Sequence, residues 1–133
     1  MPSIKAIDEI TDTIRHALGE EGAARIKRFM ETEDGWDHGR GQRFSKMSLA
    51  VLDFFLQHEP KLPTRVFEYM TANGNIQLEW VDDRGEEYEI EFFPDRFEYY
   101  CTATEEEGAI NLSEVNLLIQ KIERIAGDHA STR

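Results

Sequence analysis

The stretch that most constrains the fold is residues 75–100, NIQLEWVDDRGEEYEIEFFPDRFEYY, in which apolar and polar side chains alternate. Successive side chains of a β-strand point to opposite faces of a sheet, so this period of two predicts strands with one face toward a core and the other toward water. Two clusters of turn-forming residues interrupt the alternation, which predicts three antiparallel strands joined by tight hairpins. The core-facing sets are Ile76, Leu78 and Trp80; Tyr88, Ile90 and Phe92; and Phe97, Tyr99 and Cys101.

The register of the two hairpins follows from the same pattern. A slip of one residue would move a whole apolar set to the opposite face, so all three sets must face the core together. This requires Trp80 opposite Tyr88 and leaves a three-residue loop at positions 83–85, with Gly85 in the left-handed conformation. For the second hairpin, the same requirement that the apolar sets face the core together predicts a two-residue turn at positions 94–95.

The polar face of the predicted sheet collects carboxylates. Residues 79–107 contain twelve acidic and two basic side chains, a net charge of −10 out of −12 for the whole chain. The registers place Glu79 across from Glu89 and Glu91 across from Glu98, and like charges in such positions destabilise a sheet. The face consists of Gln77, Glu79, Glu87, Glu89, Glu91, Glu98 and Tyr100.

Three interpretations of this face are open at this point. It is a solvated surface that deters edge-to-edge aggregation, a docking surface for a basic partner such as a nucleic-acid-binding protein, or a metal or acid–base site. An open sheet face splays its carboxylates apart, whereas metal ligands must converge. We therefore expect no metal and no cofactor, and the candidate binding residues are Glu79, Glu87, Glu89, Glu91, Glu98 and Tyr100.

Helical periodicity precedes the sheet. Residues 1–31 carry apolar side chains at spacings of three and four, which predicts a helix or helix pair that Ser3 caps and that ends or bends at Gly19. Residues 45–58 predict a further helix, capped by Ser45 and apolar around much of its circumference, and hence deeply buried. The N-terminal stripe is formed by Ile4, Ile7, Ile10, Ile14 and Leu18.

A C-terminal helix is predicted over residues 112–126. Asn111 and Glu114 have the spacing of a capping box, which satisfies backbone amides at a helix start. Gly127 is a typical residue at a helix end, and residues 128–133 are expected to fray.

Together these elements predict an α+β fold in a single domain, residues 1–133. A short strand is predicted at residues 66–70, ahead of the three long ones. The sheet would then be an antiparallel meander of three or four strands over residues 66–103, with helices from both chain ends packed on one face.

Composition excludes several functional classes. The net charge of −12 argues against direct binding of nucleic acid, because phosphates are neutralised by clustered Lys and Arg. No apolar run approaches the ~18 residues of a membrane span, and the first ten residues lack the apolar core of a secretory signal. Cys101 has no cysteine to pair with, which fits a reducing compartment. We therefore expect a cytoplasmic protein that does not enter a membrane.

The glycine-rich loop TEDGWDHGRGQR holds the only residues that invite a catalytic interpretation: Trp36, Asp37, His38 and Arg40. Adjacent Asp and His residues do not place one side chain on the other, and neither a nucleophile motif nor a GxGxxG or Walker pattern accompanies them. We expect Trp36 to anchor the loop on the core and Asp37 to cap backbone amides of the turn.

The segments GWD, LP and GNIQLEW resemble motifs of a prokaryotic family of small, uncharacterised proteins. Its pattern combines a W-D-G-x-G-A loop with a G-x-I-x-L-E-W strand motif, and the resemblance covers about residues 35–100. His38 and Arg40 stand where the family pattern has glycines, and Arg43 replaces a proline. The resemblance implies a prokaryotic, cytosolic setting and an accessory role, and it supplies no activity.

The leading functional hypothesis is a non-enzymatic interaction protein, similar to an antitoxin, immunity protein or inhibitor, that presents the acidic face to a basic protein partner. One alternative is a small hydrolase or metal-dependent enzyme that uses the loop Asp and His with sheet carboxylates. Another is a homo-oligomeric accessory protein whose acidic face meets a basic region of a second copy. That region would comprise Arg25, Lys27, Arg28, Arg40, Arg43 and Lys46.

Overall fold

The computed structural model describes the backbone of residues 3–131 and the side chains of residues 3–123. Over this range the chain forms one five-stranded antiparallel sheet in the order β1-β2-β3-β4-β5, together with three α-helices and a short 3-10 helix. The elements are α1 (Asp12–Phe29), α2 (Lys46–Gln57), β1 (Phe67–Met70), β2 (Ile76–Val81), β3 (Glu87–Phe92), β4 (Arg96–Cys101), β5 (Glu106–Asn111), η1 (Leu112–Glu114) and α3 (Val115–Ser131).

Both predicted hairpin registers are confirmed. Trp80 pairs with Tyr88, and their rings stack with centroids 5.4 Å apart. The loop at positions 83–85 is closed by a hydrogen bond from the Gly85 amide to the Asp82 carbonyl, and Gly85 has φ +81°. At the second hairpin the amide of Phe93 donates to the carbonyl of Arg96 across the two-residue turn.

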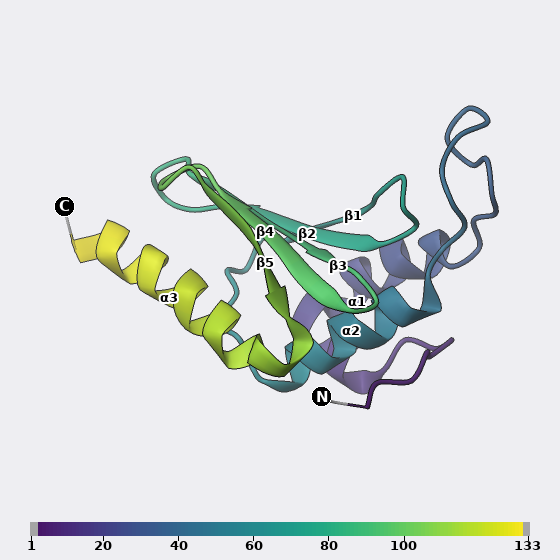
Figure 1. Ribbon diagram of the computed structural model, residues 1–133, viewed down its shortest axis with the longest axis horizontal. Coiled ribbons are helices and arrows are strands. Elements are labelled where there is room, and N and C mark those ends of the chain that lie inside the picture. The colour runs from purple at the N-terminus through teal and green to yellow at the C-terminus, as the bar shows by residue number, and fades with distance from the viewer. Residues whose placement is uncertain (1–2, 132–133) are drawn as a thin grey trace.

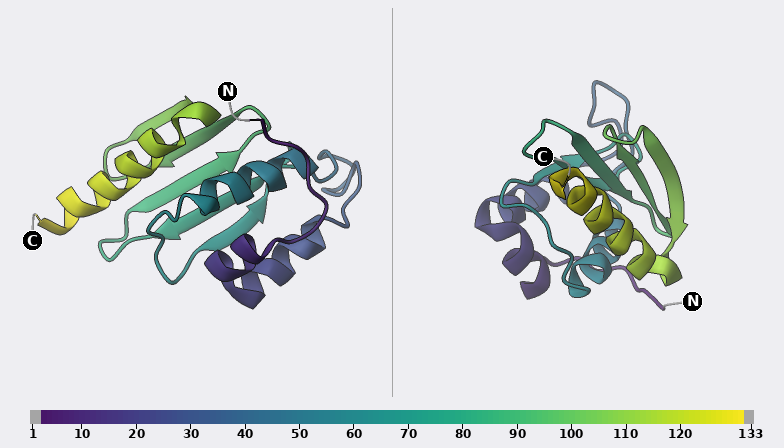
Figure 2. Two further views of the ribbon diagram at one scale, coloured as in Figure 1. Left: turned by 90° about the horizontal axis from the view of Figure 1, so that it is seen from below. Right: turned by 90° about the vertical axis from the view of Figure 1, so that its left-hand side faces the viewer.

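The helices lie on the opposite side of the sheet from its acidic surface. Figure 1 shows the sheet above the helices, and the left view of Figure 2 shows α2 crossing the sheet between α1, beside β1, and α3, beside β5. Phe55 of α2 packs against Phe92 and Phe97, with ring centroids 5.4 and 5.9 Å away. Inward side chains of the sheet and all three helices therefore share one core.

Helix α2 is the most deeply buried helix of the N-terminal half, as its pattern predicted. Seven of its twelve residues are buried, against four of eighteen in α1. Ser45 caps it as expected, because its hydroxyl accepts a hydrogen bond from the Ser48 amide. The Ser48 hydroxyl in turn accepts from the amide of Ile76, which ties α2 to the start of β2.

The prediction of a helix that starts at Ser3 is wrong. Residues 3–11 contain no helix, and α1 begins only after Thr11, whose hydroxyl accepts from the Ile14 amide and donates to Asp53 of α2. Ile4, Ile7 and Ile10 still pack against the core. A spacing of three also aligns side chains along an extended threefold chain, so it does not distinguish that chain from a helix.

The predicted interruption at Gly19 is confirmed. Gly19 has φ +75° and ψ 175°, which splits α1 into two helical pieces. The second piece lies close to β1: a Cβ at Gly22 would lie 2.7 Å from the Oε2 atom of Glu68. Residues 12–29 thus form a helix pair rather than one bent helix.

The sheet extends beyond its predicted boundary at residue 103. Residues 106–111, expected to be loop and helix cap, form β5 and pair with β4 from Cys101↔Glu106 to Arg96↔Asn111. The apolar alternation is weak there because Gly108 stands at an inward position. The ring of Tyr99 occupies that space, and a Cβ on Gly108 would lie 3.0 Å from the tyrosine oxygen.

The C-terminal helix also differs from its prediction. The side chain of Asn111 makes no capping hydrogen bond, and a 3-10 turn at Leu112–Glu114 precedes α3. Helix α3 continues through Gly127 to Ser131, so the predicted stop at that glycine is wrong. The expected fraying at positions 132 and 133 lies outside the described residues. Within the described part of the chain, no helix has the length and apolar character to cross a membrane.

Candidate functional site

The outer face of the sheet, away from the helices, brings together every predicted binding residue of the strands. Adjacent strands place Glu79 beside Glu89 and Glu91 beside Glu98, as the registers predicted. The added strand β5 contributes Glu107, which pairs with Tyr100. We call this surface the acidic face; its members are Gln77, Glu79, Glu87, Glu89, Glu91, Glu98, Tyr100 and Glu107.

One half of the acidic face is neutralised or hydrogen-bonded from within. The Oε2 atom of Glu91 accepts hydrogen bonds from the Thr71 hydroxyl at 2.8 Å and from the side-chain amides of Asn73 and Asn75. Glu98 accepts from Nε of Arg96 at 2.8 Å. These two carboxylates are therefore held in place by neighbours of the same chain.

The other half carries concentrated negative charge. Among the side chains of residues 3–123, no ion pair involves Glu79, Glu87 or Glu89. Partial burial, followed by the charges of Glu79 and then Glu87, raises the pKa of the Glu89 carboxyl above its ordinary value. Glu79 accepts a hydrogen bond from the side-chain amide of Gln77, which adds no positive charge.

Aromatic side chains flank this cluster of three carboxylates. The register of β1 puts Phe67 directly beside Glu79 and Tyr69 beside Gln77, and both aromatic residues are nearly half exposed. On the far side, Tyr100 lies beside Glu89. One row across the sheet therefore reads Phe67, Glu79, Glu89, Tyr100 and Glu107.

Sequence reasoning missed Phe67, Tyr69 and Glu107 as members of the outer face. The alternation in FEYM was visible, but Glu68 occupies the inward position and the aromatic residues point outward, the reverse of the usual pattern. Glu107 was missed together with β5. If the expected strand at residues 66–70 had been paired with the next strand, Phe67 and Tyr69 would have been assigned to the outer face.

The glycine-rich loop is a hairpin that closes on itself. Asp37 and Arg40 exchange two backbone hydrogen bonds of 2.8 and 2.9 Å around a turn at His38 and Gly39, both at positive φ. The indole Nε1 of Trp36 donates to the Gln42 carbonyl at 2.8 Å. Figure 1 shows this segment projecting from the end of the molecule.

Two predictions for this loop are wrong. Trp36 is 38 % exposed and packs on Gly41 of the loop rather than on the core. The carboxylate that accepts from a loop amide is Asp34, which binds the amide of Arg43, whereas Asp37 pairs through its backbone. That contact lowers the pKa of the Asp34 carboxyl, first through the backbone hydrogen bond and then through the guanidinium of Arg43.

Over the described residues, the hollow that the sheet carboxylates line contains no side chain of the loop. The hollow over the acidic face is lined by Gln77, Glu89, Glu91, Glu98, Tyr99, Tyr100 and Glu107, and by none of the four loop residues. Shared acid–base work needs groups within hydrogen-bond reach of one substrate. Among the residues described, no group of three His, Cys, Asp or Glu side chains could hold a metal ion.

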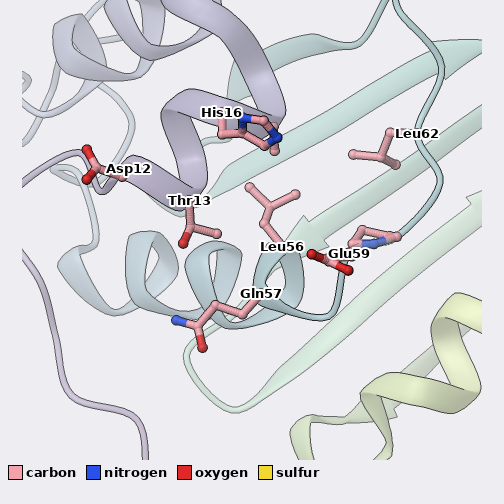
Figure 3. A pocket seen from close by; sticks show the side chains of 9 residues that line it. Asp12, Thr13, His16, Leu56, Gln57, Glu59 and Leu62 are labelled. Atoms are coloured by element: carbon pink, nitrogen blue, oxygen red, sulfur yellow. The ribbon is translucent and has the colours of Figure 1, made fainter.

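A larger pocket, of about 920 Å³, lies between the start of α1 and the end of α2. Figure 3 shows Asp12 and Glu59 on opposite sides of the view, with His16 and Leu56 between them. None of the predicted site residues lines it. Its acidic groups do not converge on the imidazole, so we assign it no chemistry.

Comparisons with known proteins return no match: no family model, no curated protein and no solved structure matches the chain. The resemblance to a prokaryotic family of small proteins therefore stays a prediction.

Proposed function

We propose that the chain is a non-enzymatic interaction protein whose acidic face binds an arginine-bearing segment of a basic protein partner. One observation carries the proposal: among the described side chains, Glu79, Glu87 and Glu89 lie together without a cationic partner on the outer face of the sheet. The exposed ring of Phe67 lies on one side of them and the half-buried ring of Tyr100 on the other. A function of the antitoxin, immunity or inhibitor type, in which this protein covers a basic surface, fits such a face.

Arginine suits the face better than lysine. A guanidinium donates two parallel hydrogen bonds to a carboxylate and stacks on an aromatic ring, whereas an ammonium is a compact point charge. Neighbouring strands are ~4.8 Å apart. Each of Glu79 and Glu89 therefore has an aromatic neighbour at the right spacing for one guanidinium to contact both groups.

The electrostatics favour a cationic ligand for a second reason. The pKa of Glu89 is raised first by its partial burial and then by the charges of Glu79 and Glu87, and a bound cation would relieve that repulsion. The net charge of −12 would also steer a basic partner toward the protein, with a rate that falls as salt rises.

Binding of a fluorescein-labelled octa-arginine peptide to charge-neutralised variants tests the proposal. The triple variant Glu79→Gln, Glu87→Gln, Glu89→Gln should weaken binding about tenfold or more, since each lost charge-assisted hydrogen bond contributes ~1.5–3 kcal/mol. The matched control, Asp8→Asn, Glu9→Gln, Glu114→Gln, changes exposed acids outside the acidic face.

Both triple variants move the net charge from −12 to −9. If binding is specific to the acidic face, the control should lose less than about threefold, the share expected from long-range attraction alone. Equal losses in the two variants would mean that the peptide senses only total charge, and the proposal would fail.

A further inference from the structure

The two outer strands of the sheet are protected to different degrees. Within residues 3–131, β1 pairs only with β2 and β5 pairs only with β4, so each leaves one backbone edge outside the sheet. Natural proteins usually guard such edges with charged side chains or a covering element. Strand β5 begins with two glutamates and contacts α3.

Strand β1 also contacts a helix, α1, but it has no charged side chain that faces water. Its only charged residue, Glu68, points inward and is 3 % exposed, whereas Phe67 and Tyr69 are 46 % and 47 % exposed. These two rings and Trp36 are three of the five large hydrophobic residues that are exposed in the described chain. Exposed apolar side chains on an outer strand without outward-facing charges are typical of a strand that pairs with a partner.

A groove runs along this edge. All four residues of β1 line it, although they alternate between the two faces of the sheet, so the groove follows the backbone edge itself. Its volume is about 580 Å³. The remaining lining consists of Arg25, Arg28, Phe29, Thr32 and Trp36.

The charge in the groove is positive despite the acidity of the chain. Nη1 of Arg25 lies 2.6 Å from Oε1 of Glu68, so the two charges compensate each other. Arg28 is exposed and takes part in none of the ion pairs formed by the side chains of residues 3–123. One uncompensated guanidinium therefore lies at the groove, with that of Arg25 three residues away on the same helix.

We propose that the β1 edge groove binds an extended acidic segment of a partner protein, which adds to the sheet as a sixth strand. Alternate residues of such a segment face one side at intervals of ~6.8 Å, and residues three apart on a helix have Cβ atoms ~5–6 Å apart. Two glutamates at positions i and i+2 would thus meet Arg25 and Arg28. The residue between them and the residues that flank them face the other side of the strand and would cover Phe67 and Tyr69.

Charge also decides against a second copy of this chain as the occupant. Pairing of β1 with β1 of another copy would bring Arg25 and Arg28 of both molecules to the same seam, between two bodies of net charge −12 each. Like charges brought together at an interface oppose association. The proposal does not depend on the acidic face, because none of its glutamates lines the groove.

The probe for this site is the labelled peptide Ser-Val-Glu-Val-Glu-Val-Ser, compared with Ser-Val-Lys-Val-Lys-Val-Ser. We expect the glutamate peptide to bind and the lysine peptide to bind at least tenfold more weakly. Arg28→Glu should weaken binding of the glutamate peptide about tenfold or more, since it replaces an attraction by a repulsion. Lys27→Glu is the matched control: Lys27 is exposed and adjacent on α1, but it does not line the groove.

Both substitutions change the net charge from −12 to −14, so a non-specific charge effect would weaken binding equally in the two variants and overturn the proposal. The triple glutamine variant of the acidic face should bind the glutamate peptide at least as well as the wild type. Loss of binding in that variant would assign the peptide to the other surface and overturn the edge site.

Strand addition itself is tested with the unmodified protein. Two versions of the glutamate peptide carry N-methyl groups on alternate backbone amides, either the odd or the even set. Because only one edge of the peptide would pair with β1, one version should lose binding at least tenfold and the other should retain it. Equal effects of the two versions would overturn strand addition.

Sedimentation velocity of the free chain tests the choice of occupant. A monomer at micromolar concentration is the expected result. A dimer that Phe67→Lys dissociates would assign the edge to a second copy and overturn the proposed peptide.

Discussion

Arg25 of α1 and Glu68 of β1 form an ion pair of 2.6 Å in which the glutamate side chain is only 2 % exposed. The guanidinium is 38 % exposed, so it reaches from water to a carboxylate that is cut off from water. This contact fastens the second half of α1 to the outer strand of the sheet. Glu68, the charged residue that breaks the apolar pattern of β1, therefore connects this strand to α1.

Removal of the arginine should therefore cost more than removal of the pair. We expect Arg25→Met to lower the free energy of unfolding by about 3 kcal/mol, because it leaves a buried carboxylate without a counter-charge. Urea denaturation measures the change. The double variant Arg25→Met, Glu68→Met should recover most of the loss, and a double variant as unstable as the single one would contradict this account.

Substitution by alanine should lower the stability of the protein by different amounts at two glycines that have almost the same backbone conformation. Gly74 and Gly85 have φ +80° and +81°, but a Cβ on Gly74 would lie 2.1 Å from the Arg43 carbonyl oxygen, whereas nothing lies within 4 Å of one on Gly85. Gly85→Ala should cost about 1 kcal/mol of stability from backbone strain alone. Gly74→Ala should cost at least about 3 kcal/mol, since the backbone must also move.

The urea midpoints of the two alanine variants give this comparison. They report changes in stability only if the free energy of unfolding falls with urea concentration at the same slope in both variants. Equal losses would mean that the segment around Arg43 moves away freely from β2. That result would contradict the close approach of the two segments.

Glu89 should make the protein less stable as the pH rises. Its pKa is raised in the folded state, so between the unfolded-state value of ~4.3 and the higher folded value the native protein holds a proton that the unfolded chain has lost. The free energy of unfolding therefore carries a contribution that falls as pH increases through this window. Glu89→Gln removes that contribution and should be about 0.5–1 kcal/mol more stable than wild type at pH 7.

Denaturation of both proteins at several pH values between about 4 and 7 measures the effect. The advantage of the glutamine variant should grow with pH, and a constant difference would contradict the assignment. Glu98→Gln serves as the control at pH 7, where it should destabilise the protein because it removes the charge-assisted hydrogen bond from Arg96.

The aromatic part of the acidic face should discriminate between cations. Tyr100→Leu should weaken binding of octa-arginine about three- to fivefold, because stacking of a guanidinium on a ring contributes ~0.5–1 kcal/mol at exposed sites. Binding of octa-lysine, measured by the same fluorescence titration, should change less than twofold. Equal losses for the two peptides would mean that the ring acts only through packing of the strand.

The alternation and the turn residues of positions 75–100 were enough to predict three strands, both registers and the common face of the glutamates. These features depend on neighbours within one hairpin, where the side-chain period and the turn length act together. The candidate carboxylates were predicted for the same reason, since Trp80 opposite Tyr88 places Glu79 opposite Glu89.

The segments whose state depends on distant contacts were predicted poorly. Residues 106–111 carry one large apolar side chain at an inward position, Ile110. They become a strand because β4 offers them an edge and Tyr99 fills the space over Gly108. Residues 3–11 have the spacing of a helix, yet they form no helix and pack against the core through Ile4, Ile7 and Ile10. Local patterns of this strength are overridden by tertiary packing.

The sequence by itself determined the central meander and the concentration of charge on one of its faces, because a period of two and the turn residues leave no other register that buries the apolar side chains. Only the tertiary structure decided which groups surround that face and where the sheet is left open. Phe67 and Tyr69 reach the outer surface, and Arg28 reaches the groove, because α1 packs on β1 through Arg25 and Glu68. That pairing joins residues 43 positions apart in the chain, a relationship that no local pattern encodes.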